Sequence, residues 1–166
     1  MNDVLRHLAD SGIVLCDKRP PSNFYRLNHD HVAAEGILLL ARMSATLVAR
    51  IRAELGNWSI PPQAAWLFGS AARGEGTEQS DIDIFLVLPA GDLDPAAVDI
   101  WERQTEVLTD KIMAWSGNRC EVVEMEAAEL SAAVERDDLL VRDLRDQAVI
   151  LAGHDPGDLL RKELLS

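Results

Sequence analysis

The segment LFGSAARGEGTEQSDIDIFLVL, residues 67–88, decides the fold of this chain of 166 residues. It combines the end of one apolar stretch, a glycine-rich loop and a second apolar stretch that opens with Asp-Ile-Asp. Side chains two residues apart on a strand point to the same face, so Asp81 and Asp83 project together while Ile82 enters the core. The segment therefore predicts a strand, a loop and a second strand that carries two carboxylates on one face.

The paired aspartates predict a metal site. Two ionised carboxylates side by side repel each other, and leaving both charged is costly without a cation. A ligand set made only of oxygen favours Mg²⁺ or Mn²⁺, which keep waters and accept substrate phosphates as further ligands. Because Asp-x-Asp alone is also common on solvated strand edges, the prediction depends on the residues that precede it.

Those preceding residues predict a phosphate site. Gly69 directly follows a strand, and glycine permits a tight turn and the close approach of a phosphate. Ser70 can add a hydroxyl donor, and the backbone N–H groups after it can point at the phosphate. Arg73 adds a permanent charge that suits a phosphate or a developing negative charge. Taken in order, the loop offers an anion cradle and the next strand offers metal ligands.

This pattern resembles the signature of the DNA polymerase β-type nucleotidyltransferases, Gly-Ser, ten residues, Asp-x-Asp, in the compact form called the minimal nucleotidyltransferase domain. Residues 69–70, 71–80 and 81–83 match that spacing, and the Ala-Arg-Gly and Ser-Asp pieces between them are typical of the family. The resemblance covers about residues 60–153. It implies the nucleotidyltransferase fold and a site that holds a nucleoside triphosphate and two Mg²⁺ ions.

The resemblance also implies a third carboxylate on a later strand. The matching position is Glu121, where the family usually has Asp; glutamate is one methylene longer and can still reach a metal. Glu124 falls on the opposite strand face and is the poorer candidate. The alternative for Glu121 is an exposed strand residue without a role. The implied metal ligands and catalytic residues are Asp81, Asp83 and Glu121, and the implied nucleotide-binding residues are Gly69, Ser70, Arg73 and Ser80.

The reaction implied by the resemblance is nucleotidyl transfer. An acceptor hydroxyl attacks the α-phosphorus of a nucleoside triphosphate, for which we expect ATP, and pyrophosphate leaves without any protein nucleophile. Known members include antitoxins that transfer AMP to a HEPN-type toxin, and antibiotic-modifying enzymes that usually carry an extra helical domain. We therefore expect a protein acceptor. The alternative is a non-enzymatic DNA-binding regulator or interaction module with a degenerate nucleotidyltransferase domain.

Periodicity and turn residues predict the remaining elements and an α/β (α+β) fold, with a small mixed β-sheet flanked by helices. Helices are predicted over residues 2–10, 30–55, 95–115, 127–134 and 138–147, and strands over 13–17, 24–28, 64–68, 81–88, 120–125 and 149–151. The prolines at 61 and 62 mark a linker. The expected parts are an arm of residues 1–57, a nucleotidyltransferase domain of residues 58–153 and a loose acidic tail of residues 154–166.

The N-terminal arm is expected to be a helix, a β-hairpin and a long helix. Residues 1–28 resemble the end of a bacterial winged helix-turn-helix domain, from the tail of the recognition helix to the close of the wing. Only the last third of such a domain is present, so we do not expect the arm to bind DNA. A truncation, a wrongly assigned start, and a remnant that serves packing or a homodimer are the readings that remain open.

Composition limits the function classes. The net charge is −12, and residues 61–166 carry nine Lys and Arg against twenty-two Asp and Glu, which argues against nonspecific adhesion to nucleic acid. Cys16 and Cys120 form neither a disulfide framework nor a zinc motif. The N-terminus has no apolar leader, and no apolar run is long enough to span a bilayer. We therefore expect a soluble cytoplasmic protein without a membrane partner.

Overall fold

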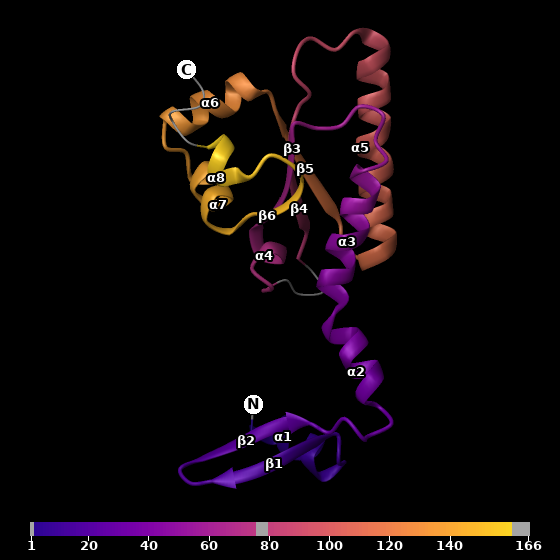
Figure 1. Ribbon diagram of the computed structural model, residues 1–166, viewed down its shortest axis with the longest axis vertical. Helices are drawn as coiled ribbons and strands as arrows, with labels where there is room; N and C mark the ends of the chain where they lie inside the picture. Colours follow the sequence, from indigo (N-terminus) through magenta and orange to yellow (C-terminus); the bar gives the residue numbers. More distant parts are fainter. Residues whose placement is uncertain (1, 76–79, 161–166) are drawn as a thin grey trace. The chain divides into compact units, whose positions relative to one another are not determined.

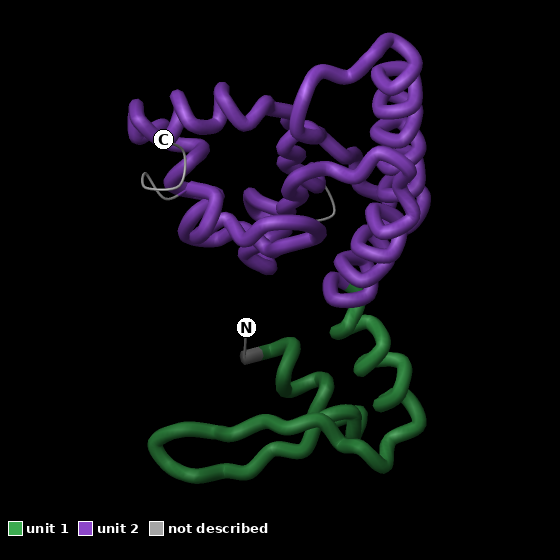
Figure 2. Tube along the Cα trace, turned by 45° about the horizontal axis from the view of Figure 1, so that its top comes forward, with its two compact units in different colours: residues 1–43 green, residues 44–166 purple. Residues whose placement is uncertain are grey.

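The computed structural model describes residues 2–75 and 80–160. The chain forms two compact units, Met1–Met43 and Ser44–Ser166, which Figure 2 distinguishes by colour. None of the helices in the described ranges is both long and apolar enough to cross a membrane.

The first unit consists of a helix, a hairpin and a second helix. Helix α1 is Asn2–Asp10, strands β1 (Val14–Arg19) and β2 (Ser22–Leu27) pair antiparallel, and helix α2 is Ala34–Ala41. The predicted helix and hairpin are confirmed, with small shifts at their ends. Among the described residues of this unit only Ala34 is buried, and a two-stranded hairpin without a covered apolar face is marginal by itself.

The single long helix predicted over residues 30–55 is wrong at its start and in its middle. It begins only at Ala34, because side chains of the preceding turn accept the backbone N–H groups: Asn28 Oδ1 from Asp30 (3.2 Å) and His31 Nδ1 from Ala33 (3.1 Å). It is also divided at Arg42, whose N–H donates to the carbonyl of Leu39, three residues back rather than four. Helix α3 then runs over Met43–Leu55.

The second unit is built on a four-stranded mixed sheet with the order β5-β4-β3-β6 (Figure 1). The strands are β3 (Ala64–Phe68), β4 (Ile82–Val87), β5 (Cys120–Met125) and β6 (Val149–Gly153). Strand β3 pairs antiparallel with β4 and β6, whereas β4 and β5 are parallel. A parallel pair needs a crossover connection, and the long helix α5 (Pro95–Ser116) supplies it.

Helices cover both faces of this sheet. Figure 1 shows α3 and α5 on one side, and α6 (Ala127–Glu135), α7 (Leu139–Gln147) and α8 (Pro156–Leu159) on the other. Alternate residues of β4 enter the two cores, as period-2 alternation predicts. Ile82, Ile84 and Leu86 pack with Ile51, Leu55, Trp101 and Leu108, whereas Phe85 and Val87 pack with Trp66, Leu130, Val141 and Leu144. The predicted mixed sheet flanked by helices is confirmed.

Two boundaries differ from those expected. The first compact unit ends at Met43, and the buried side chains of Ile51 and Leu55 make α3 part of the sheet's core rather than of the arm. The chain after β6 is also not loose throughout. Asp155 caps α8 by accepting from the Gly157 N–H at 2.7 Å, and Leu160 is buried in the second core.

Candidate active site

The register of the parallel strands brings the predicted carboxylates together. Asp83 pairs with Glu121 across β4 and β5, so their side chains share one sheet face, the face that α6 and α7 cover. Asp81 directly precedes β4 and lies on the same side by strand parity. Asp83 is half-buried, whereas Glu121 is exposed. Two carboxylates that are close in sequence thus share a sheet face with a third, which comes 38 residues after Asp83.

The neighbouring charges and burial shift the pKa of Asp83. Burial raises the pKa of Asp83 above its ordinary value, and the carboxylates of Glu121 and Asp81 raise it further. The Arg73 guanidinium acts in the opposite direction, and Asp143 adds a smaller increase to the same pKa. The surroundings of Asp83 therefore disfavour its negative charge, and a bound cation would relieve that cost.

Gly69 supports this cluster from the neighbouring strand. It begins the short helix α4 (Gly69–Ala72) directly after β3, where Phe68 pairs with Asp83. Its φ is +68°, and a Cβ added there would overlap Oδ2 of Asp83. Only glycine satisfies both the left-handed backbone and the space next to the carboxylate. Ser70 follows in α4, and its carbonyl accepts from the N–H of Glu75 at 3.0 Å.

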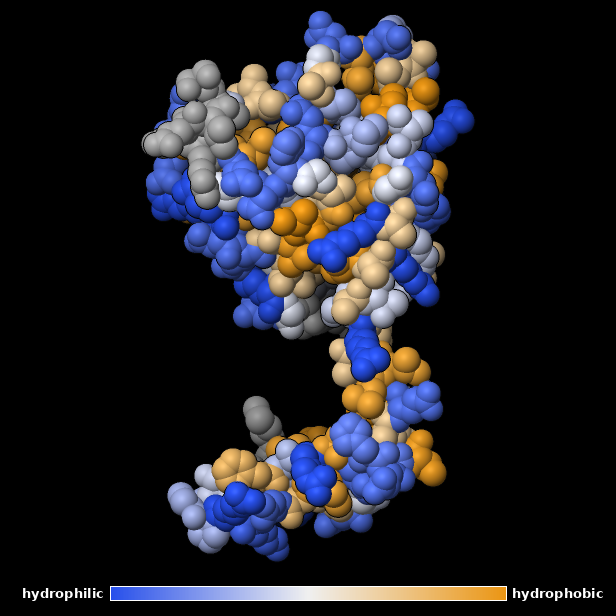
Figure 3. All heavy atoms as spheres, in the orientation of Figure 1, coloured by the Kyte–Doolittle hydropathy of each residue, from blue (hydrophilic) through white to orange (hydrophobic). Residues whose placement is uncertain are grey.

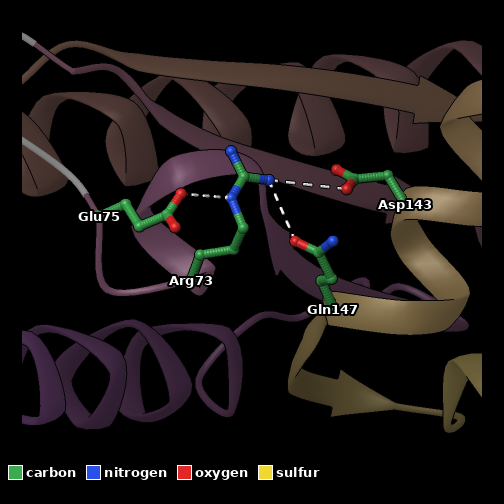
Figure 4. A network of polar contacts seen from close by, with 4 residues as sticks. All are labelled: Arg73, Glu75, Asp143 and Gln147. Atoms are coloured by element: carbon green, nitrogen blue, oxygen red, sulfur yellow. Dashed lines mark hydrogen bonds and ion pairs between the residues drawn. The ribbon is translucent and has the colours of Figure 1, made fainter.

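Arg73 lies in a polar network that the sequence does not predict. Its Nε donates to Glu75 Oε2 at 2.9 Å, and its Nη1 donates to Gln147 Oε1 at 3.1 Å. The same Nη1 lies 3.6 Å from Asp143 Oδ1. Figure 4 shows the guanidinium between Glu75 on one side and the two α7 side chains on the other. No periodicity or spacing in the sequence links α7 to Arg73, because the contact exists only in the folded chain.

The start of β4 is fixed by the turn that precedes β5. Asn118 Nδ2 donates to the carbonyl of Ser80 at 2.7 Å, and the Ile82 N–H donates to the carbonyl of Arg119 at 2.8 Å. These contacts join the chain just before Asp81 to the chain just before Glu121. In the sequence, Ser-Gly-Asn at residues 116–118 indicates only a helix stop, so the anchoring role of Asn118 was missed.

Besides Glu121, strand β5 carries two other chemically reactive side chains, Glu124 and Cys120. Glu124 accepts from Trp101 Nε1 (2.9 Å) and Thr105 Oγ1 (3.2 Å), both on α5, so it lies on the face opposite Glu121 as parity predicts. Burial, Asp83 and Glu121 raise the pKa of Cys120 to about 12. A thiol with that pKa is protonated at neutral pH and is a poor nucleophile.

The donor set fits a hard cation by its chemistry. Asp81, Asp83 and Glu121 offer only carboxylate oxygens, the ligands that Mg²⁺ and Mn²⁺ prefer. Within residues 2–75 and 80–160, however, no three His, Cys, Asp or Glu side chains converge tightly enough to enclose a metal ion.

The same strands and helices carry the match to a known family. Residues 48–150, more than half of the chain, match the family described as nucleotidyltransferase domain. The chain belongs to the nucleotidyltransferase domain family. The matched range contains β3, α4, β4, α5 and β5, and hence every residue discussed in this site. Residues 1–47 lie outside it, so the winged-helix resemblance of the N-terminal arm stays a prediction.

Several solved structures resemble this chain more distantly. One is the crystal structure of a toxin–antitoxin with AMP-PNP, at 23% identity and a TM-score of 0.42, covering 71% of this chain and 82% of that chain. Another is the toxin–antitoxin MntA–HepT, at 21% identity and a TM-score of 0.37, covering 73% of this chain and 79% of that chain. No curated protein matches the chain.

Proposed function

We propose that this nucleotidyltransferase domain transfers a nucleoside monophosphate, AMP from ATP, to a hydroxyl of an acceptor in a metal-dependent reaction. The observation that carries the proposal is the pairing of Asp83 with Glu121, next to Asp81 and in contact with the Cβ-free backbone of Gly69. It joins the metal-binding part of the family signature to the loop that the signature assigns to phosphate. Membership of the family supports the reaction class.

Each residue has a defined part in this proposal. Asp81, Asp83 and Glu121 would hold Mg²⁺ or Mn²⁺, and a bound ion would offset the negative charge of the triphosphate. Gly69 leaves room for the Asp83 carboxylate at the start of the loop that the signature assigns to phosphate. The other residues that we assign to the nucleotide are Ser70, Arg73 and Ser80. The chemistry needs no protein nucleophile, which agrees with the raised pKa of the one thiol beside the site, Cys120.

The acceptor that we propose is a hydroxyl group of a protein, such as a HEPN-type toxin. This part rests on the resemblance of residues 60–153 to minimal nucleotidyltransferase domains, some of which act on such toxins. A toxin of this class, produced by a neighbouring gene, is therefore the first acceptor to test. The same assay without an added acceptor tests whether the domain modifies itself.

The decisive experiment uses α-labelled nucleoside triphosphates with Mg²⁺, with and without the candidate toxin. We expect labelled acceptor and released pyrophosphate from the wild type, and none from Glu121→Gln. Glu124→Gln is the matched control: it changes the same residue type on the same strand, but on the other sheet face, where a glutamine oxygen can still accept from Trp101. Glu121→Asp, which restores the usual family residue, should keep activity.

Binding separates this function from the alternative. The double variant Asp81→Ala/Asp83→Ala should lose Mg²⁺-dependent nucleotide binding. A wild type that binds no nucleotide and releases no pyrophosphate would reject the enzyme, and a gel shift with the upstream promoter would then test the DNA-binding regulator. Equal turnover by Glu121→Gln and the wild type would instead remove Glu121 from the site while keeping the reaction.

For the first unit we propose self-association with a second copy of this chain. Residues 1–43 hold five Lys and Arg against five Asp and Glu, so the net charge of −12 lies in the second unit. Copies that meet through the neutral unit avoid most of this repulsion. Apolar surface gathers over α2 (Figure 3), and the exposed large apolar residues in and beside it are Val32, Leu39, Leu40 and Met43.

A further inference from the structure

Helix α7 reaches the site through Arg73. The guanidinium is held on two edges. Its Nε donates to Glu75 in the same loop, and its Nη1 donates to Gln147 and pairs with Asp143, both on α7. The other terminal nitrogen, Nη2, makes none of these three contacts (Figure 4). Contacts on two edges fix the plane of a guanidinium, because the group is rigid and planar.

The position of Asp143 is electrostatically unfavourable for a site that takes a triphosphate. Its carboxylate lies 3.6 Å from the Arg73 guanidinium and adds a negative charge beside the loop that is assigned to the triphosphate. Arg73, which pairs with Asp143, carries the opposite charge. Taken only as a charge, Asp143 would repel the nucleotide.

We propose that Asp143 and Gln147 are positioning residues, which hold Arg73 beside Asp83 so that its remaining N–H groups meet the triphosphate next to Gly69. The inference rests on the proposed nucleotide-binding function and deepens it by assigning to α7 a part in nucleotide affinity. Arg73 and Asp143 are both about one-third exposed, at 35% and 33%, so their ion pair is partly screened and its effect is moderate.

The two roles of Asp143 predict opposite signs for one substitution. If Asp143 acts only through its charge, Asp143→Asn removes a repulsion and nucleotide binds more tightly. If Asp143 positions Arg73, the same change loosens the guanidinium and nucleotide binds more weakly. The sign of the change in the dissociation constant therefore distinguishes positioning from simple repulsion.

The experiment measures the dissociation constant of α,β-methylene ATP, whose α–β linkage is not cleaved, in the presence of Mg²⁺. Isothermal titration calorimetry on the full chain gives this value. We expect Asp143→Asn to bind roughly threefold more weakly, as loss of a partly exposed ion pair implies. Asp143→Glu, which keeps the charge, should restore most of the affinity. Asp146→Asn is the matched control, because Asp146 is exposed on the same helix.

A double-variant cycle tests whether Asp143 acts through Arg73. Arg73→Gln should weaken binding by itself, and Arg73→Gln/Asp143→Asn should bind no more weakly than Arg73→Gln alone, since the group that Asp143 positions is already absent. Additive losses would overturn the proposal. So would tighter binding, or binding equal to that of Asp146→Asn, in the single variant Asp143→Asn.

A readout without nucleotide separates this inference from the proposed function. The Nε–H signal of Arg73 in nuclear magnetic resonance, assigned by its loss in Arg73→Gln, should shift and exchange faster in Asp143→Asn but not in Asp146→Asn. If the wild type binds no nucleotide, the proposed function fails and the nucleotide role of α7 fails with it, whatever this signal does. If the wild type binds nucleotide but neither the signal nor the affinity responds to Asp143→Asn, only the present inference fails.

Discussion

At the scale of single residues, Asp83 is a carboxylate whose surroundings disfavour its negative charge. It lies against the backbone of Gly69 and opposite Glu121, in surroundings that raise its pKa. Because the folded-state pKa is raised, the stability linked to this group is fully present below the unfolded pKa and is lost as the pH rises through the folded pKa. At neutral pH the ionised group therefore works against folding.

Removal of that charge should stabilise the protein without metal. In a buffer that contains a chelator, Asp83→Asn should raise the thermal midpoint at pH 7 by about 2 °C, and the gain should shrink as the pH falls through the pKa of Asp83. Calorimetric melts at several pH values measure this difference. Asp146→Asn, which removes one exposed charge from the same acidic chain, is the control and should give a smaller gain.

The same pair of proteins tests the metal. Mg²⁺ should raise the midpoint of the wild type at pH 7, because it binds only the folded chain, and should leave Asp83→Asn almost unchanged. An equal response of both proteins would contradict the assignment of Asp83 as a ligand. No gain for Asp83→Asn at neutral pH, relative to the control, would contradict the raised pKa.

Gly69 should be sensitive to a single added methyl group. Gly69→Ala should lower the free energy of unfolding by about 2–3 kcal/mol, because it combines a left-handed backbone with an overlap with Asp83. Gly91→Ala is the matched control: its φ is +87°, but nothing lies near the added Cβ, so it should cost about 1 kcal/mol. Urea denaturation compares the two, and equal losses would show that the contact with Asp83 does not matter.

At the scale of elements, the crossover from β4 through α5 to β5 builds the site. Asp94 caps α5 by accepting from the Ala97 N–H at 2.8 Å, and Gly117 ends the helix with a φ of +78°. The buried face of α5 packs on the sheet and thereby sets where β5 returns. The pairing of Asp83 with Glu121 therefore depends on the packing of a helix that contains no site residue.

Truncation of a buried side chain of α5 should lower the free energy of unfolding much more than truncation of its exposed neighbour. Leu108 is 0% exposed, so Leu108→Ala should destabilise the protein by about 3 kcal/mol in urea denaturation. Val107, the preceding residue on α5, is 39% exposed, and Val107→Ala should stay within about 0.5 kcal/mol of the wild type. Similar losses for both variants would mean that α5 does not pack on the sheet as described.

At the scale of the whole molecule, the two compact units differ in how much they bury and in their net charge. Ser44–Ser166 holds the sheet, both cores and all the acidic excess, whereas Met1–Met43 is neutral and nearly without buried side chains. A small unit without a core needs another surface to cover its apolar residues. This is the physical reason for expecting a second copy to bind there.

Self-association should therefore depend on α2. Sedimentation velocity over a dilution series should show a dimer for the wild type and a monomer for Leu40→Glu, which places a charge on a residue that is 67% exposed. Leu139→Glu is the control, because Leu139 is 77% exposed but lies in the second unit. A monomeric wild type at all concentrations, or dissociation of both variants alike, would reject the dimer.

Most of the elements, and the placement of Asp81 and Asp83 on one strand face, can be predicted from local sequence. The apolar stretches around residues 64–68, 81–88, 120–125 and 149–151 predict all four strands of the larger sheet, because apolar patterning and turn residues act over only a few positions. Parity alone places Asp81 with Asp83 and separates Glu121 from Glu124. The fold class could be predicted for the same reason, since it depends on the order of helices and strands.

Contacts between distant segments were decided only by the tertiary structure. The turn before the predicted helix over residues 30–55 sets its late start at Ala34, and only its second part packs against the sheet. The opposition of Asp83 and Glu121 required the register of a parallel pair, and the approach of Asp143 to Arg73 required the docking of α7. Such contacts leave no period in the sequence, because they join residues whose spacing along the chain is unrelated to their distance in space.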